Sequence, residues 1–270
     1  MTDDTVGLAR IESGRPDGPV LLLANAIGTS WDMWDAQLPM LEPHFRVIRF
    51  DHRGQGRSPL PVRRGRYRME ELGYDVLAML DDLGVSSANF AGMSLGGMVG
   101  LWLAARVPDR VERLALLCTS ARLEPASTWQ TRANAVRRGG LPELAPLIVE
   151  RWFTPAFAAR RPEVVTRFTS MLVASPPEGY ASCCEAIAEF DGTADLPWVV
   201  APTLVVAGGG DLAIPVEHSQ RIADGIAGAR LAIVPDAAHL ANVEQPDAIG
   251  ALLLEHFVEQ LRDTTTPIKE

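Results

Sequence analysis

The segment from Gly92 to Gly96 reads Gly-Met-Ser-Leu-Gly and matches the pattern G-x-S-x-G. In this pattern the serine sits on a sharp, strained turn between a strand and a helix, where a side chain in place of either glycine would collide with the backbone. An apolar run, Ala88 to Ala91, precedes the pattern, and a helical stretch, Leu95 to Arg106, follows it. Ser94 is therefore predicted to be a nucleophile for a carbonyl carbon. The alternative is a serine that only caps the helix.

A nucleophilic serine needs a base, and the chain has five histidines. His239 follows the predicted strand Arg230 to Val234, and the carboxyl ends of parallel strands face one crevice. His239 is therefore predicted to be the base. His52 also follows a strand, and a structural role is expected for it. The remaining three are expected at the surface: His44, His218 and His256.

Asp211 follows the strand-like run Thr203 to Ala207 and three glycines, so it too is expected at a strand end. A carboxylate there can accept the second ring N–H of His239 and stabilise the charged ring. The order serine, aspartate, histidine along the chain is the one that accompanies G-x-S-x-G in α/β folds. Asp236 is the competing acid, but it lies very near His239 on the same loop.

A carbonyl attacked by Ser94 becomes an oxyanion, which two backbone N–H groups can stabilise. One is expected to be that of Leu95, directly after the serine. The other is assigned to Ile27, in the loop that follows the apolar run Val20 to Ala24. Asn25 could hold this loop in place by side-chain hydrogen bonds.

Apolar runs of strand length alternate with helical stretches, which predicts an α/β fold with a mostly parallel central sheet flanked by helices. Strands are expected at Val20–Ala24, Phe45–Phe50, Ala88–Ala91, Leu114–Leu117, Thr203–Ala207 and Arg230–Val234. Helices are expected at Met69–Leu83, Leu95–Arg106, Pro215–Ala227 and Pro246–Leu261.

This alternation stops between Arg122 and Asp195, where helical stretches are separated by prolines and glycines and no strand-like run occurs. The sequence therefore predicts a helical cap at residues 122–195, inserted into an α/β-hydrolase core formed by residues 1–121 and 196–270.

The 270 residues carry a net charge of −9, which argues against a nucleic acid or an anionic membrane as the main partner. No stretch is apolar for long enough to cross a bilayer. Three cysteines, an odd number, favour free buried thiols in a cytoplasmic protein over disulfides, and none has zinc-finger spacing: Cys118, Cys183 and Cys184. The sequence does not distinguish a monomer from a small homo-oligomer.

Several stretches together resemble the 3-oxoadipate enol-lactonases of the α/β-hydrolase superfamily, over nearly the whole chain. Asn25 stands where many relatives have histidine, as does Gln55. The stretches are Asn25–Thr29, Asp51–Ser58, Gly92–Met98, Arg151–Thr154, Gly179–Cys184 and Ala238–Pro246.

The resemblance implies an enzyme that opens 3-oxoadipate enol-lactone to 3-oxoadipate through Ser94 and an acyl-enzyme, with no cofactor and no metal. Such a substrate is a small anion, so an arginine is expected near the pocket. Trp129 and Arg132, which share a helix face, are candidates for contact with it. Their rivals are Arg137, Arg138 and Arg151.

Two other functions are compatible with the same residues. A general carboxylesterase or a cofactor-free perhydrolase would use the same triad beneath a different cap lining. A non-catalytic ligand-binding module is the second alternative, because the fold also serves as a receptor. Such modules usually lack a triad member, and Ser94, Asp211 and His239 are all present.

Overall fold

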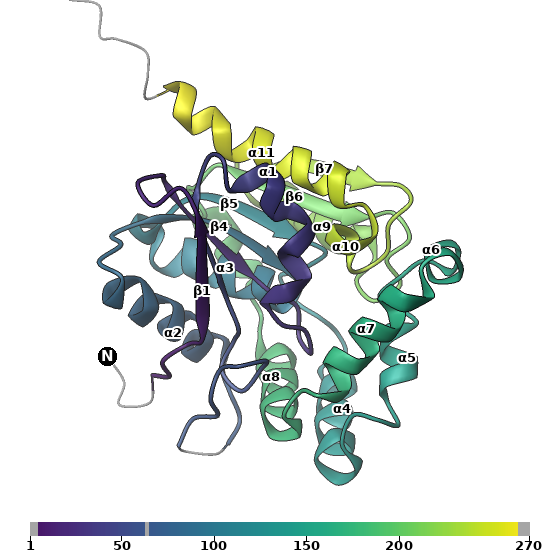
Figure 1. The fold of residues 1–270 in the computed structure, drawn as a ribbon. Coiled ribbons are helices and arrows are strands. Elements are labelled where there is room, and N and C mark those ends of the chain that lie inside the picture. The colour runs from purple at the N-terminus through teal and green to yellow at the C-terminus, as the bar shows by residue number, and fades with distance from the viewer. Residues whose placement is uncertain (1–4, 63–64, 264–270) are drawn as a thin grey trace, which may run out of the picture.

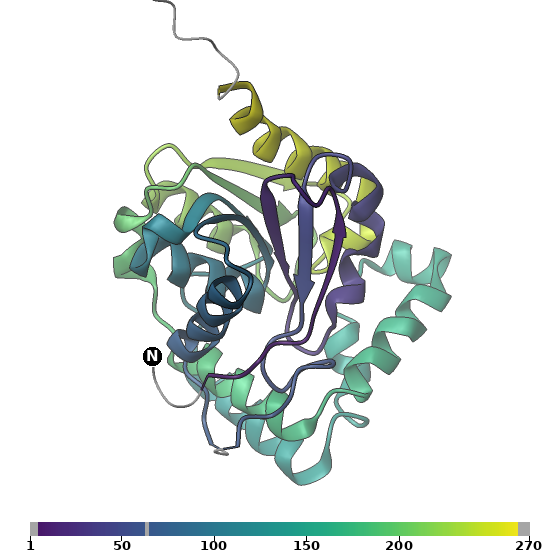
Figure 2. The ribbon, with the colours of Figure 1, turned by 60° about the vertical axis from the view of Figure 1, so that its left-hand side comes forward.

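The computed structural model describes residues 5–62 and 65–263, in which helices cover both faces of one twisted sheet (Figures 1 and 2). The described strands form a seven-stranded sheet in the order β1-β3-β2-β4-β5-β6-β7. Only β1 runs antiparallel, against β3. The strands are β1 Arg10–Gly14, β2 Val20–Ala24, β3 Arg46–Phe50, β4 Ala88–Met93, β5 Val111–Leu117, β6 Thr203–Gly208 and β7 Arg230–Val234.

The six strands expected from apolar runs are all present, and the predicted mostly parallel sheet flanked by helices is confirmed. β4 and β6 are buried at every residue, as strands covered on both faces must be. β1 was not predicted. Its residues Arg-Ile-Glu-Ser-Gly contain no apolar run and stay partly exposed, because an edge strand is paired on one side only.

Two groups of helices cover the sheet. α2 Met69–Asp82, α3 Leu95–Arg106 and α9 Val216–Gly225 lie on one face together with the 3-10 helices η2 Pro108–Arg110 and η3 Thr193–Trp198. The opposite face is covered by η1 Trp31–Gln37, α1 Leu38–Leu41, α10 Ala241–Glu244 and α11 Pro246–Asp263. α2 buries its apolar positions from Met69 to Leu80 and is followed by Gly84, whose φ of +66° suits a helix stop.

Five further helices separate β5 from β6 and gather beside the sheet at the lower right of Figure 1. They are α4 Ala126–Gly139, α5 Ala145–Val149, α6 Pro155–Arg160, α7 Pro162–Val173 and α8 Pro177–Glu189. A β-bridge between Arg122 and Asp191 brings the two ends of this insertion together. These helices occupy the interval assigned to the cap, while the division of the chain into core and cap stays a prediction.

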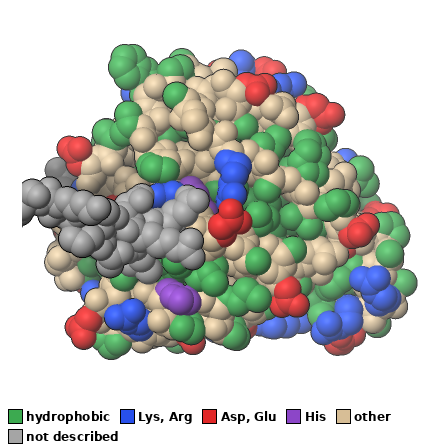
Figure 3. Space-filling model, turned by 90° about the horizontal axis from the view of Figure 1, so that it is seen from above, with side chains coloured by type: hydrophobic (Ala, Val, Ile, Leu, Met, Phe, Trp, Pro, Cys, Tyr) green, Lys and Arg blue, Asp and Glu red, His purple; other side chains and the backbone are tan. Residues whose placement is uncertain are grey.

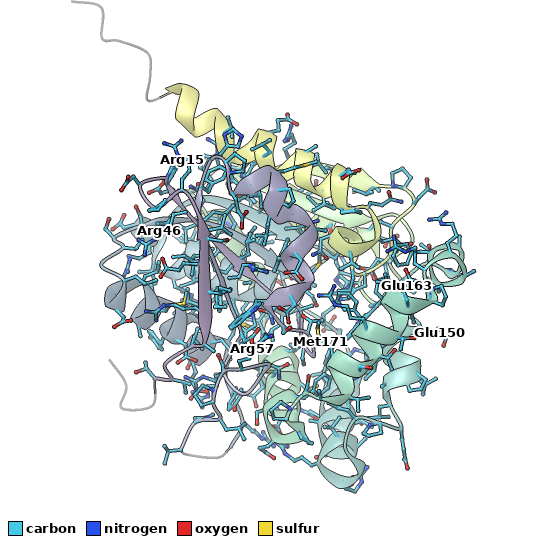
Figure 4. All side chains as sticks on the ribbon, viewed as in Figure 1. Arg15, Arg46, Arg57, Glu150, Glu163 and Met171 are labelled. Carbon is cyan, nitrogen blue, oxygen red and sulfur yellow. The ribbon has the colours of Figure 1, made fainter. Side chains whose placement is uncertain are left out.

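The inserted helices touch the loops that follow β2 and β3. The side chain of Met171 on α7, labelled in Figure 4, reaches the loop after β2, and the N–H of Ser30 donates to its sulfur at 3.2 Å. On α8 the backbone at Gly179 approaches Gly54 so closely that a side chain at either position would collide with the other residue. The insertion is therefore packed directly onto the carboxyl edge of the sheet.

The cysteines are buried and free, as the sequence predicts: Cys118, Cys183 and Cys184. Basic and acidic side chains are interspersed over the face of the described residues in Figure 3. In the described part of the chain, no helix has both the length and the apolarity needed to span a membrane.

A buried ion pair fixes the loop after β3 to α2. The guanidinium of Arg53 donates to both carboxylate oxygens of Asp75, at 2.5 and 2.7 Å, and the N–H of Val6 donates to the same carboxylate at 2.7 Å. Both side chains are at most 2% exposed. Removing one charge from such a pair leaves the other one desolvated and poorly compensated.

We expect Asp75→Asn to lower the free energy of unfolding by about 3 to 5 kcal/mol, because the buried Arg53 charge loses its two short contacts to a carboxylate and keeps the longer ion pair with Glu71 at 3.6 Å. The matched control is Asp82→Asn in the exposed pair with Arg10, for which a loss below about 1 kcal/mol is expected. Urea unfolding followed by circular dichroism measures both. Equal losses in the two variants would contradict the prediction.

Candidate active site

Ser94 stands alone between β4 and α3, with φ 55° and ψ −113°. Residues other than glycine rarely adopt this backbone conformation. It places Ser94 directly before the N-terminus of α3. A Cβ at Gly92 would strike the backbone of Gly96, and one at Gly96 would strike Ala24. The collision argument that the sequence suggested for these two glycines is therefore confirmed.

Neighbouring strand ends hold this turn in place. The N–H of Ser94 donates to the carbonyl of Leu117 at 2.9 Å, and the hydroxyl of Thr119 donates to the carbonyl of Ser94 at 2.7 Å. The N–H of Gly96 donates to the carbonyl of Asn25 at 3.2 Å. The serine is thus fixed from β5 on one side and from the loop after β2 on the other.

The structure brings His239 and Asp211 together, with Nδ1 of the ring 2.8 Å from Oδ2 of the carboxylate. The second oxygen, Oδ1, accepts the N–H groups of Ala213 and Ile214 at 2.8 and 2.9 Å, which orients the carboxylate. A carboxylate only accepts, so Nδ1 carries the proton and Nε2 is left with its lone pair. Asp236, the competing acid, is exposed to solvent.

The loop from Asn25 to Thr29 is tied down on both sides. The amide of Asn25 donates to the carbonyl of Thr29 at 3.0 Å, as expected, and Gln55 accepts the N–H of Gly28 at 2.9 Å. Gln55 therefore has a structural task at the position where relatives often have histidine. Within the described residues, the N–H groups of Ile27 and Leu95 donate to no protein acceptor, so both are available to a ligand.

A cavity of about 320 Å³ lies beside the serine, and both Ser94 and His239 line it. Ile27 lines it as well. Other parts of its wall come from the segment between β5 and β6 and from the loop after β6: Leu123, Trp129, Arg132, Trp152, Tyr180 and Ile214. The cavity is therefore largely apolar and carries few charged groups, which is typical of a site for a small molecule.

The four candidate arginines have different surroundings. Arg132 lines the cavity with its guanidinium 4.6 Å from the centre of the Trp129 ring, as their helical spacing suggested. Arg151 lines the same cavity. Arg137 instead forms ion pairs with glutamates of α8, and Arg138 is exposed outside the cavity wall.

A second cavity of about 590 Å³ adjoins the first and shares Arg132 and Arg151 with it. Its remaining wall is mostly apolar, with Leu144, Leu147 and Leu212 among its residues. The two arginines therefore stand where the inner cavity meets a wider apolar one.

The other histidines depart in part from expectation. His52 is buried with Nε2 3.2 Å from the carbonyl of Asn25, and burial lowers its pKa to about 4, so it is a structural residue as expected. His256 was expected at the surface but is only 5% exposed, because its face of α11 turns toward the sheet; burial lowers its pKa to about 4. The surface expectation is also wrong for His218, which is half-buried and lines the cavity of Ser94.

Over the described ranges, His, Cys, Asp and Glu side chains form no group of three that could hold a metal ion.

The α/β hydrolase fold is the family whose model matches this chain, over residues 19–246. The 3-oxoadipate enol-lactonase 2 of Acinetobacter baylyi is 40% identical over 250 residues, which cover 93% of this chain and 92% of that protein. A second enol-lactonase of the same organism, 3-oxoadipate enol-lactonase 1, is 31% identical and covers 87% of each chain.

Solved structures agree with these comparisons. The enol-lactonase from Burkholderia xenovorans superimposes with a TM-score of 0.90 at 38% identity, covering 93% of this chain and 96% of that one. A hydrolase from Pseudomonas aeruginosa gives a TM-score of 0.89 at 45% identity, covering 93% and 94%. The resemblance inferred from the sequence motifs is thereby confirmed.

Glu244 joins the insertion to the loop of His239, a role that the sequence motifs did not predict. Its buried carboxylate accepts the N–H of Ala238 at 2.9 Å and both the N–H and the hydroxyl of Thr154. In the same place the N–H of Leu240 donates to the carbonyl of Trp152 at 3.0 Å. The available signal was an acid within the resemblance stretch Ala238–Pro246, but its partner lies 90 residues away in the chain.

Glu244→Gln replaces one acceptor oxygen by an NH₂ group that faces backbone donors. We expect the free energy of unfolding to fall by about 1 to 3 kcal/mol and the amide protons of Ala238 and Thr154 to exchange faster. Amide hydrogen exchange and urea unfolding measure these effects. Glu255→Gln, at an exposed glutamate paired with Arg230, is the control. Unchanged protection at Ala238 and Thr154 would refute the prediction.

Proposed function

The chain belongs to the α/β hydrolase fold family, and we propose that it hydrolyses 3-oxoadipate enol-lactone to 3-oxoadipate with Ser94 as nucleophile. It is an enzyme that acts on ester bonds. The observation that carries the proposal is the cavity lined by both Ser94 and His239, with His239 oriented by Asp211 at 2.8 Å. The free, buried cysteines support the predicted cytoplasmic location.

In the first step the oxygen of Ser94 attacks the lactone carbonyl while Nε2 of His239 takes the serine proton. Asp211 accepts the Nδ1 proton and stabilises the charged ring. The oxyanion accepts hydrogen bonds from the free N–H groups of Ile27 and Leu95. The location of Leu95 at the N-terminus of α3 favours negative charge there.

Collapse of the tetrahedral intermediate breaks the ring C–O bond and frees an enol, whose oxygen is a better leaving group than an alkoxide. Proton donation by His239 is therefore less demanding than for a simple ester. A water molecule, deprotonated by His239, then attacks the acyl group on Ser94. This second step releases 3-oxoadipate and restores the serine hydroxyl.

The substrate carries a carboxylate, and two cations border the cavity. Arg132 is held over the Trp129 ring, and Arg151 lies at the junction with the outer cavity. Either guanidinium can bind a carboxylate by two parallel hydrogen bonds. We assign the carboxylate site to Arg132 because the stacking contact already orients its side chain.

The adjoining apolar cavity favours a second candidate, a carboxylesterase of broader range on the same triad. Its volume of about 590 Å³ exceeds what a small lactone fills, and Leu147 and Leu212 on its wall are 65% and 71% exposed. An aryl or alkyl ester could extend into this space. Turnover of aryl esters that rivals turnover of the enol-lactone would favour this candidate.

With freshly made enol-lactone, followed by its loss of ultraviolet absorbance, Ser94→Ala is expected to lose about 10⁴- to 10⁶-fold in kcat. Asp211→Asn is expected to lose about 10⁴-fold, since the histidine then adopts the wrong tautomer. The control is Asp236→Asn, at an exposed acid on the histidine loop, which keeps wild-type rates. If the wild type spares the lactone but cleaves aryl esters through Ser94, the substrate assignment fails and the nucleophile stands.

Arg132→Gln is expected to raise KM for the enol-lactone about 10- to 100-fold, which corresponds to losing one charge-assisted contact. KM for a neutral aryl acetate should change by less than about twofold, because that ester has no carboxylate. Arg151→Gln tests the rival, and Arg138→Gln, at an exposed arginine outside the cavity, is the control. An increase in KM confined to Arg151→Gln would move the carboxylate site to that residue.

A further inference from the structure

His218, at the start of α9, is a second histidine in the cavity of Ser94 and His239. The proposed triad does not use it. Its Nδ1 lies 2.8 Å from the hydroxyl oxygen of Ser120, a residue that follows β5. Among the described residues, Nε2 of His218 forms no hydrogen bond, so that nitrogen is available to a ligand.

The hydrogen bonds of Ser120 decide which nitrogen of His218 carries the proton. The hydroxyl oxygen of Ser120 lies 2.6 Å from the carbonyl oxygen of Arg122, and it accepts the N–H of Arg122 at 3.0 Å. A carbonyl cannot donate, so the single hydroxyl proton of Ser120 must point at Arg122. Ser120 can then only accept from His218. Nδ1 of His218 is therefore protonated, and Nε2 keeps its lone pair.

The surroundings also favour the neutral form of this ring. Burial and the nearby charge of Arg221 lower the pKa of His218 below its ordinary value, against the opposing influence of Glu217 and Asp211. A neutral imidazole with an accessible lone pair is a proton acceptor, and once charged it is a proton donor. His218 thus has the properties of a base in a cavity that already contains one.

The proposed reaction creates a task for a second base, and this inference rests on that proposed function. Because the ester is cyclic, the enol that Ser94 expels stays covalently attached to the acyl group. It cannot leave the cavity before the acyl-enzyme is cleaved. During that time Nε2 of His239 is engaged with the serine oxygen or with the attacking water, so it is not free for the enol.

We propose that His218 converts this tethered enol into the ketone, so that the protein has keto–enol tautomerase activity in the same cavity. Nε2 takes the proton from the enol oxygen, and the electron pair of the O–H bond stays on that oxygen as an enolate. An oxygen electron pair then forms the second bond of the carbonyl while the electron pair of the C=C bond takes the proton from Nε2 onto the neighbouring carbon. No other reactant is consumed, and His218 returns to its starting state.

The test is hydrolysis of the enol-lactone in D₂O, quenched early, with the label read at the carbon that was the ring vinyl carbon. After conversion to a chiral derivative, NMR resolves the two hydrogens of that carbon. The wild type is expected to place deuterium on one face. His218→Gln is expected to lose this preference, with ketone formation lagging behind lactone loss. His44→Gln, at a half-buried histidine outside the cavity wall, keeps one-face labelling.

Each outcome is decisive. Equal labelling by the wild type, or one-face labelling by His218→Gln, overturns the tautomerase proposal alone. A wild type that leaves the lactone intact overturns the proposed function and this proposal with it. Should His218→Gln fail to fold, ¹⁵N NMR of the wild type still tests the premise. Protonation of His218 on Nδ1 is expected, and a proton on Nε2 would overturn the proposal.

Discussion

The turn at Ser94 combines a positive φ of 55° with a residue that has a side chain, a conformation that costs about 1 to 3 kcal/mol unless its surroundings enforce it. Those surroundings are the ends of three parallel strands. β5 binds the turn through Leu117, the loop after β2 binds it through Asn25, and β4 leads directly into it. The close approach of Gly96 to Ala24 leaves no room for a side chain. The serine therefore projects from the carboxyl edge of the sheet because the ends of these three strands hold its backbone in place.

The same edge collects residues that lie far apart in the chain. Asp211 follows β6 and His239 follows β7, and their 2.8 Å contact forms because the loops after neighbouring parallel strands emerge side by side. Glu244 then connects this loop to the inserted helices through Thr154. The loop of His239 and the inserted helices both border the cavity, and the buried carboxylate of Glu244 binds one to the other. Arg132 and Arg151 add positive charge to this largely apolar cavity, whose wall also includes Glu124, paired with Arg122 at 2.8 Å.

Two histidines in one cavity are held in the same tautomer by different partners. The carboxylate of Asp211 accepts a hydrogen bond from Nδ1 of His239. The hydroxyl of Ser120, whose own proton is donated to Arg122, accepts one from Nδ1 of His218. The carboxylate partner stabilises a charged ring, which suits a base that must carry a proton through a transition state. The neutral hydroxyl gives less of this stabilisation, and burial together with the charge of Arg221 lowers the pKa of His218. This difference is consistent with the proposed roles, in which His239 acts in cleavage of the ester and His218 in conversion of the enol to the ketone.

The sequence alone determined six strands, the glycines around Ser94, and the strand-end positions of Asp211 and His239, because apolar runs and glycine turns are local properties of the chain. Only the tertiary structure decided the edge strand β1, which forms by pairing with β3 and has no apolar run of its own. It also decided which polar residues face the cavity. His218 carried no local signal, because its partner Ser120 is 98 residues away, and the contact of Glu244 with Thr154 spans 90 residues of the chain. The burial of a polar side chain is set by what packs against it, and for these residues the packing partners are distant in sequence.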